Sequence, residues 1–508
     1  MKLTPVIGLE IHVQLKTKSK MFCACDNAGE NQAANTTVCP ICMGHPGVLP
    51  VTNKQAVEWS VMSALALGCE IPKISKFDRK SYFYPDLPKN YQISQYDQPI
   101  GLKGKLTIQT KEGPKEIGIT RLHLEEDAAK NFHSPDGKHT LVDYNRSSTP
   151  LMEIVTEPDM RSPLQAKTFA QELRAIMRYL NVSDADMEKG HLRCDANVSL
   201  TDQPQDKIDI NKLQPKTEIK NLNSFKAIER ALEYEIKRQT KLWEAGTPPK
   251  QQSTRGWDEN KGITQDQRFK EEASDYRYFP EPDLPPLNFE PGQPDALNVA
   301  AIKDSLIELP QAKRQRYTQE FGLSLENAKI VTDEKGLADF FERTITELRA
   351  WLLSLDEVEG TQDEIWEKNK AKLAKLTYNW LINKLIALSY KDGKKINVTP
   401  ENFAEFITIV YQNKINSAIA QKLLEIMHTT GKDPSVIMVE QDLDKNVKSG
   451  DIETIVDRII AQNPNQVEQY KKGKTTLIQF FIGQIMRETK GQADPEQLKN
   501  ILTNKLNK

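Results

Sequence analysis

Long apolar stretches are what this sequence most plainly lacks. Its longest apolar-rich run, near residues 61–68, is far shorter than the roughly 20 residues of a membrane-spanning helix. The first ten residues contain Lys2, Pro5 and Glu10, so no charged segment followed by an apolar one forms a signal peptide. We therefore expect a cytoplasmic protein that makes no contact with a membrane.

Cysteine and net charge are also scarce. Six cysteines in 508 residues are too few for a disulfide framework, which favours a reducing compartment. The 69 basic and 71 acidic side chains nearly cancel, so only local basic patches could serve a nucleic-acid interface. A chain of this length exceeds one ordinary hydrophobic core and predicts two or three domains.

Four of the cysteines form two close pairs in one polar loop, residues 21–45. Cys23 and Cys25 precede Cys39 and Cys42, and this spacing is typical of a closed tetrahedral zinc site. Because sulfur would fill all four positions, the metal would stabilise the loop rather than catalyse. The alternative is four ordinary reduced thiols, and His45 is a less favoured ligand.

Several segments alternate apolar and polar residues, which is the period of a β-strand with one buried face. In residues 6–15 the apolar side chains fall on one face, and Glu10, His12 and Gln14 fall on the other. Similar strands are predicted at 119–127, 151–155, 191–200 and 216–221. If they pair in one antiparallel sheet, its polar face collects Glu10, His12, Lys80, Arg121, Glu125, Glu153, Arg193, Asp195, Glu218 and Lys220.

Such a face predicts phosphoryl-transfer chemistry. Carboxylates repel one another unless cations lie among them. Carboxylate oxygens suit Mg²⁺, and interleaved arginine and lysine suit phosphates, so we expect a cradle for a nucleotide and its metal. The alternative, a solvated acidic face, does not explain the interleaved basic residues.

Two regions rich in aromatic, charged and proline residues predict shaped loops. Residues 77–89, which include Lys80, would present cationic groups, and residues 255–258 with 275–286 would close the cradle. The proline density of residues 280–294 predicts a domain boundary.

Helical periodicity marks the rest of the chain, so the expected class is α+β. Helices are predicted at 54–68, 224–243, 306–321, 336–353, 377–389, 401–413 and 416–427. Near the C-terminus, basic residues surround an apolar helix stripe and could contact an RNA backbone or form an ordinary solvated face. These residues are Lys471, Lys472, Lys474, Arg487 and Lys490.

Long motifs in these segments resemble the B subunits of the aspartyl/glutamyl-tRNA amidotransferases, the GatB family. The motifs are GLEIH at 8–12, FDRK at 77–80, LHLEED at 122–127, EIVTEPD at 153–159, LRCDANVS at 192–199, EIKNLNS at 218–224 and DYRYFP at 275–280. They follow the family order over nearly the whole chain. Gly483-Gln484-Ile485-Met486 resembles the tail domain of the family.

The resemblance implies a three-subunit enzyme that uses ATP, Mg²⁺ and glutamine to amidate Glu-tRNA(Gln) or Asp-tRNA(Asn). An amidase partner would release ammonia, and a small third partner would brace the amidase against this chain. The resemblance further implies a glutamine-synthetase-like cradle over residues 1–292, a helical domain over 293–405 and a tRNA-binding tail over 406–508.

Within the implied cradle, each polar residue receives an expected role. Glu10, His12 and Glu125 would hold Mg²⁺, with Glu126 and Glu153 beside them. A second set completes the expected site: Lys80, Arg193 and Lys220 as contacts to the nucleotide phosphates, and Asp195 and Glu218 as contacts to a second metal or to ammonia.

The sequence departs from the family pattern at a few positions. Ser147 and Ser148 replace a glycine-bearing pair, Ala129 replaces a glycine, and Gln267 replaces a methionine. Glycine tolerates positive φ where serine and alanine are strained, so we expect altered turn geometry here but no lost ligand.

Two other functions compete with this one. A freestanding glutamine-synthetase-like ligase would leave the long helical half without a role. A zinc-containing tRNA-binding scaffold would have a cradle that is only structural. Glutamate and aspartate differ by one methylene, worth about 1–3 kcal/mol in a pocket, so the sequence does not choose between the two tRNAs.

Overall fold

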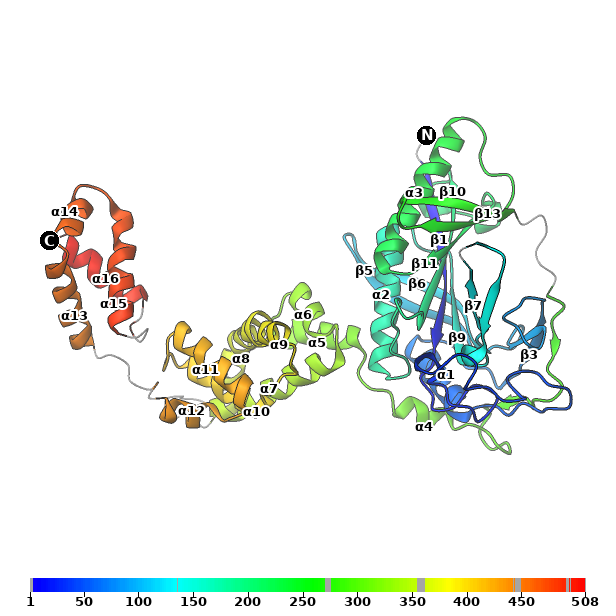
Figure 1. The fold of residues 1–508 in the computed structure, drawn as a ribbon, viewed down its shortest axis with the longest axis horizontal. Coiled ribbons are helices and arrows are strands. Elements are labelled where there is room, and N and C mark those ends of the chain that lie inside the picture. The colour runs from blue at the N-terminus through cyan, green and yellow to red at the C-terminus, as the bar shows by residue number, and fades with distance from the viewer. Residues whose placement is uncertain are drawn as a thin grey trace. The chain divides into compact units, whose positions relative to one another are not determined.

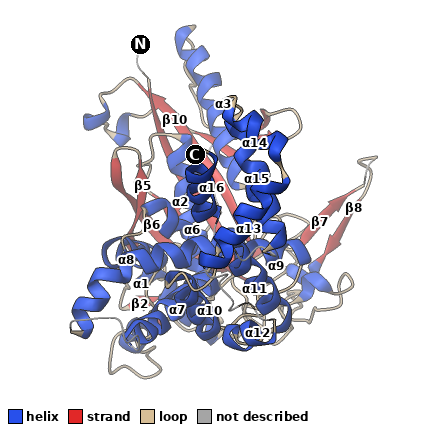
Figure 2. Cartoon of the chain, turned by 90° about the vertical axis from the view of Figure 1, so that its left-hand side faces the viewer, coloured by secondary structure: helices blue, strands red, loops and turns tan. Residues whose placement is uncertain are grey.

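The computed structural model describes residues 3–134, 136–269, 276–353, 361–441, 443, 449–489, 493 and 495–507. The chain divides into two compact units, residues 1–309 and 310–508 (Figure 1). Every described strand belongs to the first unit, and the second unit is helical, which confirms the α+β class (Figure 2). No described helix combines the length and the apolar character that crossing a bilayer requires.

An eight-stranded sheet forms the centre of the first unit, in the order β13-β12-β11-β10-β1-β9-β6-β5. In chain order these strands are β1 (Thr4–Gln14), β5 (Gly101–Thr110), β6 (Gly113–Glu126), β9 (Pro150–Thr156), β10 (Leu192–Thr201), β11 (Thr217–Leu222), β12 (Ser253–Asp258) and β13 (Ile263–Phe269). All neighbours are antiparallel except β11 and β12, which run parallel. The strands that carry the predicted polar face therefore pair as expected, and the parallel pair lies beyond them.

Helices cover the apolar face of this sheet. Figure 1 shows α2 (Pro163–Tyr179) and α3 (Phe225–Glu244) side by side along it, and α1 (Lys54–Ala66) packs on β5 and β6. Asn53, Ser162 and Ser224 accept a backbone N–H at the three helix starts, as capping residues do. The alternating apolar residues of β1 lie in the core with the inner faces of these helices.

Both predicted loops contain strands, so the loop assignment is wrong there. Residues 78–81 form β3 (Asp78–Ser81), which pairs with β4 (Tyr91–Ser94) and β14 (Phe279–Pro280). Residues 255–258 belong to β12. Pairing with neighbouring strands satisfies the backbone of both segments, which composition alone could not reveal. Asp275 lies outside the described residues.

The first unit extends further than the predicted boundary after residue 292. Short helix α4 (Val299–Asp304) packs against α1, and residues 297–309 lie on the same core. The predicted helix at 306–321 therefore begins only at α5 (Pro310–Phe321).

The second unit contains two hydrophobic cores. The first core is built from α5, α6 (Leu325–Val331), α7 (Lys335–Leu353), α8 (Gln362–Trp380), the π-helical turn Leu381–Leu385, α9 (Ile386–Asp392), α10 (Pro400–Tyr411), α11 (Ser417–Thr430) and α12 (Pro434–Glu440). The second is built from α13 (Ser449–Gln462), α14 (Pro464–Lys471), α15 (Ile478–Glu488) and α16 (Pro495–Leu506).

Two sequence predictions differ from this arrangement. The helix predicted at 377–389 starts earlier, because Thr361 and Glu364 form a capping box at the start of α8. The domain boundary predicted between residues 405 and 406 falls inside α10, whose two halves share one core with α11.

Candidate active site

The register of the sheet brings the predicted polar residues into one row. Glu153 on β9 lies opposite His12 on β1 and opposite His123 on β6, and His12 lies opposite Arg193 on β10. One step along, Glu10 lies opposite Asp195. Because side chains alternate along each strand, this row projects from a single face of the sheet.

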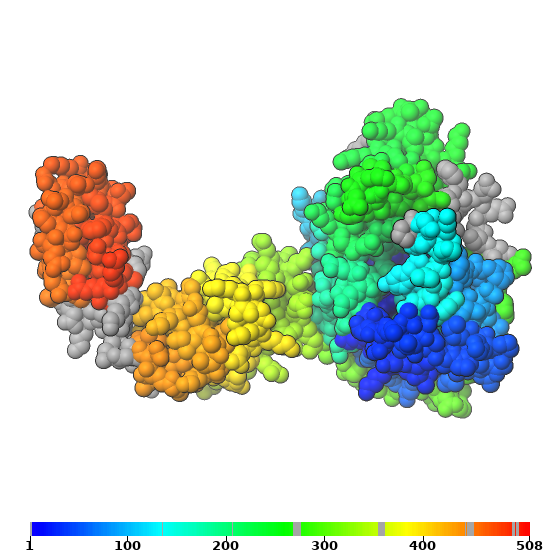
Figure 3. Space-filling view, in the orientation of Figure 1, coloured from blue at the N-terminus to red at the C-terminus, as the bar shows by residue number. Residues whose placement is uncertain are grey.

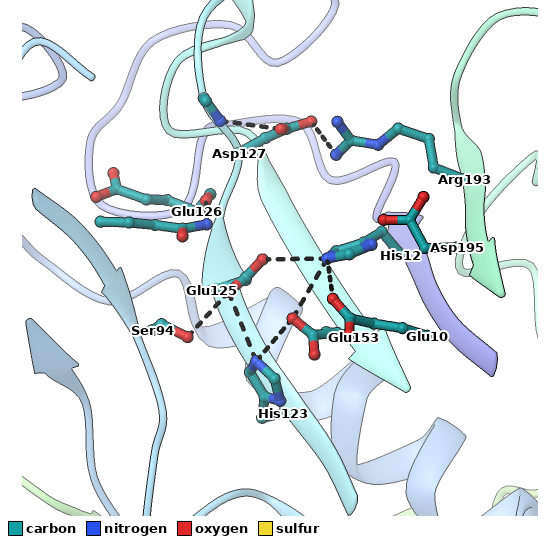
Figure 4. A network of polar contacts seen from close by, with 12 residues as sticks. Glu10, His12, Ser94, His123, Glu125, Glu126, Asp127, Glu153, Arg193 and Asp195 are labelled. Carbon is teal, nitrogen blue, oxygen red and sulfur yellow. Dashed lines mark hydrogen bonds and ion pairs between the residues drawn. The ribbon is translucent and has the colours of Figure 1, made fainter. Parts of the chain in front are cut away.

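The row is a close cluster of two imidazoles and three carboxylates (Figure 4). His12 Nε2 is 3.3 Å from Glu153, 3.8 Å from Glu125 and 4.0 Å from Glu10. His123 Nε2 is 3.3 Å from Glu153 and 3.5 Å from Glu125. Figure 3 shows a hollow between the cyan and green segments, with the dark blue of the N-terminal segment at its bottom.

Burial and mutual charge both act on this cluster. Burial opposes the charged form of His12 and His123, but the carboxylates outweigh it and raise the pKa of His12, and that of His123 to about 9. Burial favours protonated Glu153, yet the two imidazoles hold its pKa well below the usual range. The pKa of Glu10 is raised, first by burial and then by Glu153. The cluster is therefore a dense set of charges that compensate one another.

Glu125 and Glu126 are adjacent in sequence but point to different surroundings. Glu125 faces the imidazoles and accepts a hydrogen bond from Ser94 Oγ at 2.9 Å. Glu126 pairs with Lys89 and accepts the backbone N–H of Ile93 at 3.0 Å. Figure 4 shows its carboxylate directed away from His12, so the structure does not bring Glu126 into the cluster.

Basic residues flank the cluster on two sides. Lys220 bridges Asp195 at 2.6 Å and Glu218 at 3.0 Å. Arg193 donates to Asp127 at 2.8 Å. These contacts orient Lys220 and Arg193 toward the same face that carries the row.

Lys80 differs from these cations because no described carboxylate forms an ion pair with it. Its Nζ lies 4.9 Å from the centre of the Tyr276 ring and 5.8 Å from that of Tyr82. Burial opposes its charge, but Glu125 and other nearby groups outweigh this effect and raise its pKa. A cation held between aromatic rings keeps its hydrogen-bond donors available for a ligand.

His123 and Asp127 have positions that our sequence interpretation did not assign to the site. His123 was expected on the polar face with Arg121 and Glu125 but without a role; its register opposite Glu153 makes it a full member. Asp127 is buried and accepts from Arg193 and from Gln14 Nε2 at 2.7 Å. Its place at the end of an acidic run was the available signal.

The four paired cysteines come together as predicted. One sulfur atom from each of Cys23, Cys25, Cys39 and Cys42 lies within 4.8 Å of all the others. A tetrahedral zinc–thiolate site needs sulfur atoms about 3.8 Å apart, so small side-chain rotations suffice. Hydrogen bonding between Cys23 and Cys42 raises the pKa of Cys23 and lowers that of Cys42 to about 5, so a thiolate is already favoured.

Only one of the family departures produces backbone strain. Ser148 has a φ of 65°, in the left-handed region that favours glycine. Ser147 has a φ of −53°, and Ala129 is not among the residues with positive φ. Gln267 lies exposed on β13, close enough to Gly256 to meet an added Cβ there.

The basic residues predicted near the C-terminus are exposed where the structure describes them. Lys471 ends α14, Lys472 pairs with Glu468, and Lys474 follows in the next turn. Arg487 lies in the last turn of α15. Lys490 lies outside the described residues.

Two family models match the chain. A model described as the GatB/GatE catalytic domain matches residues 5–293, and a model described as the GatB domain matches residues 363–506. The chain belongs to the GatB family. As a GatB-family member it is the B component of a tRNA amidotransferase, and its N-terminal match is the catalytic domain of an ATP-dependent ligase.

Full-length relatives agree with this membership. The GatB protein of the aspartyl/glutamyl-tRNA(Asn/Gln) amidotransferase from Carboxydothermus hydrogenoformans is 44% identical over 509 residues, covering 99% of this chain and 98% of the relative. The protein of the same description from Caldanaerobacter subterraneus subsp. tengcongensis is 44% identical over 512 residues and covers 100% of both chains. That of Persephonella marina is 42% identical over 505 residues, with 99% of each covered. The freestanding ligase is therefore set aside.

Proposed function

We propose that this GatB-family chain phosphorylates the side-chain carboxylate of Glu-tRNA(Gln) or Asp-tRNA(Asn) with ATP and then amidates it. The row formed by His123, Glu153, His12 and Arg193 is the observation that carries the proposal. It joins a buried carboxylate–imidazole cluster to a guanidinium on one sheet face. Phosphoryl transfer needs such a junction of metal ligands and anion-binding groups.

The cluster fits a hard divalent cation. Carboxylate oxygens of Glu10, Glu125 and Glu153 converge with His12, and the three-residue groups within them meet the spacing of metal ligands. These four residues would hold Mg²⁺, which when bound neutralises charge on the transferring phosphoryl group. Glu126 is directed toward Lys89 and would act only through the strand that it shares with Glu125.

The phosphate contacts would come from Lys80, Arg193 and Lys220. Lys80 is the strongest candidate, because its ammonium has aromatic neighbours but no described carboxylate partner. Asp127 would orient Arg193, and Asp195 with Glu218 would orient Lys220. Asp195 and Glu218 also remain our candidates for a contact to a second metal or to ammonia.

The proposed chemistry proceeds in two displacements. A carboxylate oxygen of the substrate attacks the γ-phosphorus of ATP, and ADP leaves. Ammonia then attacks the carbonyl carbon of the acyl phosphate, inorganic phosphate leaves, and the nitrogen loses a proton to give the amide. The first step is required because the oxygen of a free carboxylate is a poor leaving group.

The remaining parts of the chain would serve the partners. The amidase partner would supply ammonia from glutamine, and the small third partner would join the amidase to this chain. The exposed Lys471, Lys472, Lys474 and Arg487 would contact the tRNA backbone, and the four cysteines would hold a structural Zn²⁺.

Amide formation on the tRNA tests the proposal. The chain is co-expressed with its amidase and small partners and supplied with Glu-tRNA(Gln), or with Asp-tRNA(Asn), together with Mg-ATP and ammonium. Wild type should form amidated tRNA with ATP hydrolysis, and Glu125→Gln should abolish both. If the wild type binds tRNA but amidates neither substrate, the chain is a zinc-containing scaffold instead.

A further inference from the structure

A buried lysine lies beside the cysteine cluster without a carboxylate partner. Lys20 is 0% exposed, and its Nζ lies 3.9 Å from Cys42 Sγ and donates to the Tyr144 carbonyl at 3.4 Å. No described carboxylate forms an ion pair with it. Burying an ammonium group is strongly unfavourable unless an opposite charge lies nearby.

The backbone prevents Lys20 from escaping this position. Its N–H donates to the carbonyl of Cys25 at 3.0 Å, and Asn53 Nδ2 donates to its carbonyl at 3.1 Å. Asn53 also caps α1, so the lysine is tied both to the cysteine loop and to the core helix. Its neighbour Lys18 is exposed by contrast.

The thiols are the remaining source of negative charge. Cysteine binds a divalent metal as thiolate, so four cysteines around one divalent ion carry an excess of about two negative charges. This excess is itself costly in a half-buried loop. An ammonium beside Cys42 Sγ would lower the cost for both partners.

We propose that Lys20 is the counter-charge of the metal–tetrathiolate site and raises its affinity for zinc. The inference rests on the structural zinc site of the proposed function. It assigns a role to a residue outside the four ligands. Groups around a metal site commonly change its affinity by about 10–100-fold.

Zinc affinity of the full chain tests this role. Lys20→Met removes the charge and the hydrogen bond, and Lys20→Gln removes the charge but keeps a donor for the Tyr144 carbonyl. Affinity is measured by competition with a chromogenic chelator, together with bound zinc per chain and the charge-transfer spectrum of the Co²⁺-substituted site. Both variants should bind zinc about 10–100-fold more weakly. Lys18→Met, the matched control, should bind like the wild type.

Each other outcome would overturn the proposal in a recognisable way. Wild-type affinity in both variants would show that Lys20 is not a counter-charge. Weak binding by Lys20→Met together with normal binding by Lys20→Gln would assign the effect to the Tyr144 hydrogen bond. If the wild type holds no zinc and Cys42→Ser changes nothing, the metal site itself fails. Circular dichroism checks that each variant folds, and Co²⁺ titration of Lys20→Gln decides the case if Lys20→Met does not.

Discussion

Replacing Ser148 with glycine should stabilise the protein, although the residue is fully buried. Its φ of 65° lies in the left-handed region, which costs a residue with a Cβ about 1–2 kcal/mol per position. Its buried Oγ has no hydrogen-bond partner among the described residues, and an unsatisfied buried hydroxyl costs about 1–3 kcal/mol. Glycine removes both costs.

Two opposing effects reduce the gain. Glycine adds about 0.5–1 kcal/mol of chain entropy to the unfolded state. The lost Cβ contacts cost about 0.8 kcal/mol, the value of one buried methylene. We therefore expect Ser148→Gly to raise the free energy of unfolding by about 1 kcal/mol, taking the lower values for the two relieved costs.

Ser147 supplies the matched control, one residue away. Its φ is −53° and its Oγ donates to the Cys42 carbonyl at 3.3 Å. Ser147→Gly therefore gains nothing from relieved strain, loses a hydrogen bond of about 1 kcal/mol and adds the same unfolded-state entropy. It should destabilise the protein by about 1.5–2 kcal/mol.

Urea unfolding followed by tryptophan fluorescence measures the difference between the two variants. Hydrogen exchange of the peptide containing Met21 reports the site directly, because the Met21 N–H donates to the Ser148 carbonyl at 2.7 Å. Exchange there should slow in Ser148→Gly and accelerate in Ser147→Gly. If both variants lose stability equally, the argument from strain at Ser148 is wrong.

Further predictions concern activity and tRNA binding. Glu153→Gln should lower kcat for amide formation by about 10²–10³, the effect of losing one preorganised electrostatic group, whereas the exposed Glu116→Gln should not; a kcat for Glu153→Gln within about threefold of wild type would exclude its role. Lys80→Met should reduce kcat/KM for ATP by about tenfold or more, because a charged hydrogen bond contributes about 1.5–3 kcal/mol, and unchanged kinetics would favour the scaffold function. Charge reversal of Lys471 and Lys474 should weaken tRNA binding in a filter assay and lower the salt slope by about 1 per contact; an unchanged slope would make this an ordinary solvated face.

The pattern of residues along each strand was sufficient to predict the polar face. Strict alternation in residues 6–15 and 191–200 assigns Glu10, His12 and Asp195 to one side, because period 2 is a local property of the extended chain. The paired spacing of the cysteines was equally local. Both predictions needed no knowledge of which strands are neighbours.

The sequence by itself therefore determined the α+β class, the family and most of the residues on the polar face. Only the tertiary structure decided which of them meet, because register depends on contacts between strands that are distant in the chain. That register placed His123 opposite Glu153, and the tertiary contacts turned Glu126 toward Lys89. The same applies to Lys20, whose burial beside Cys42 is invisible in a polar loop until the chain closes around it.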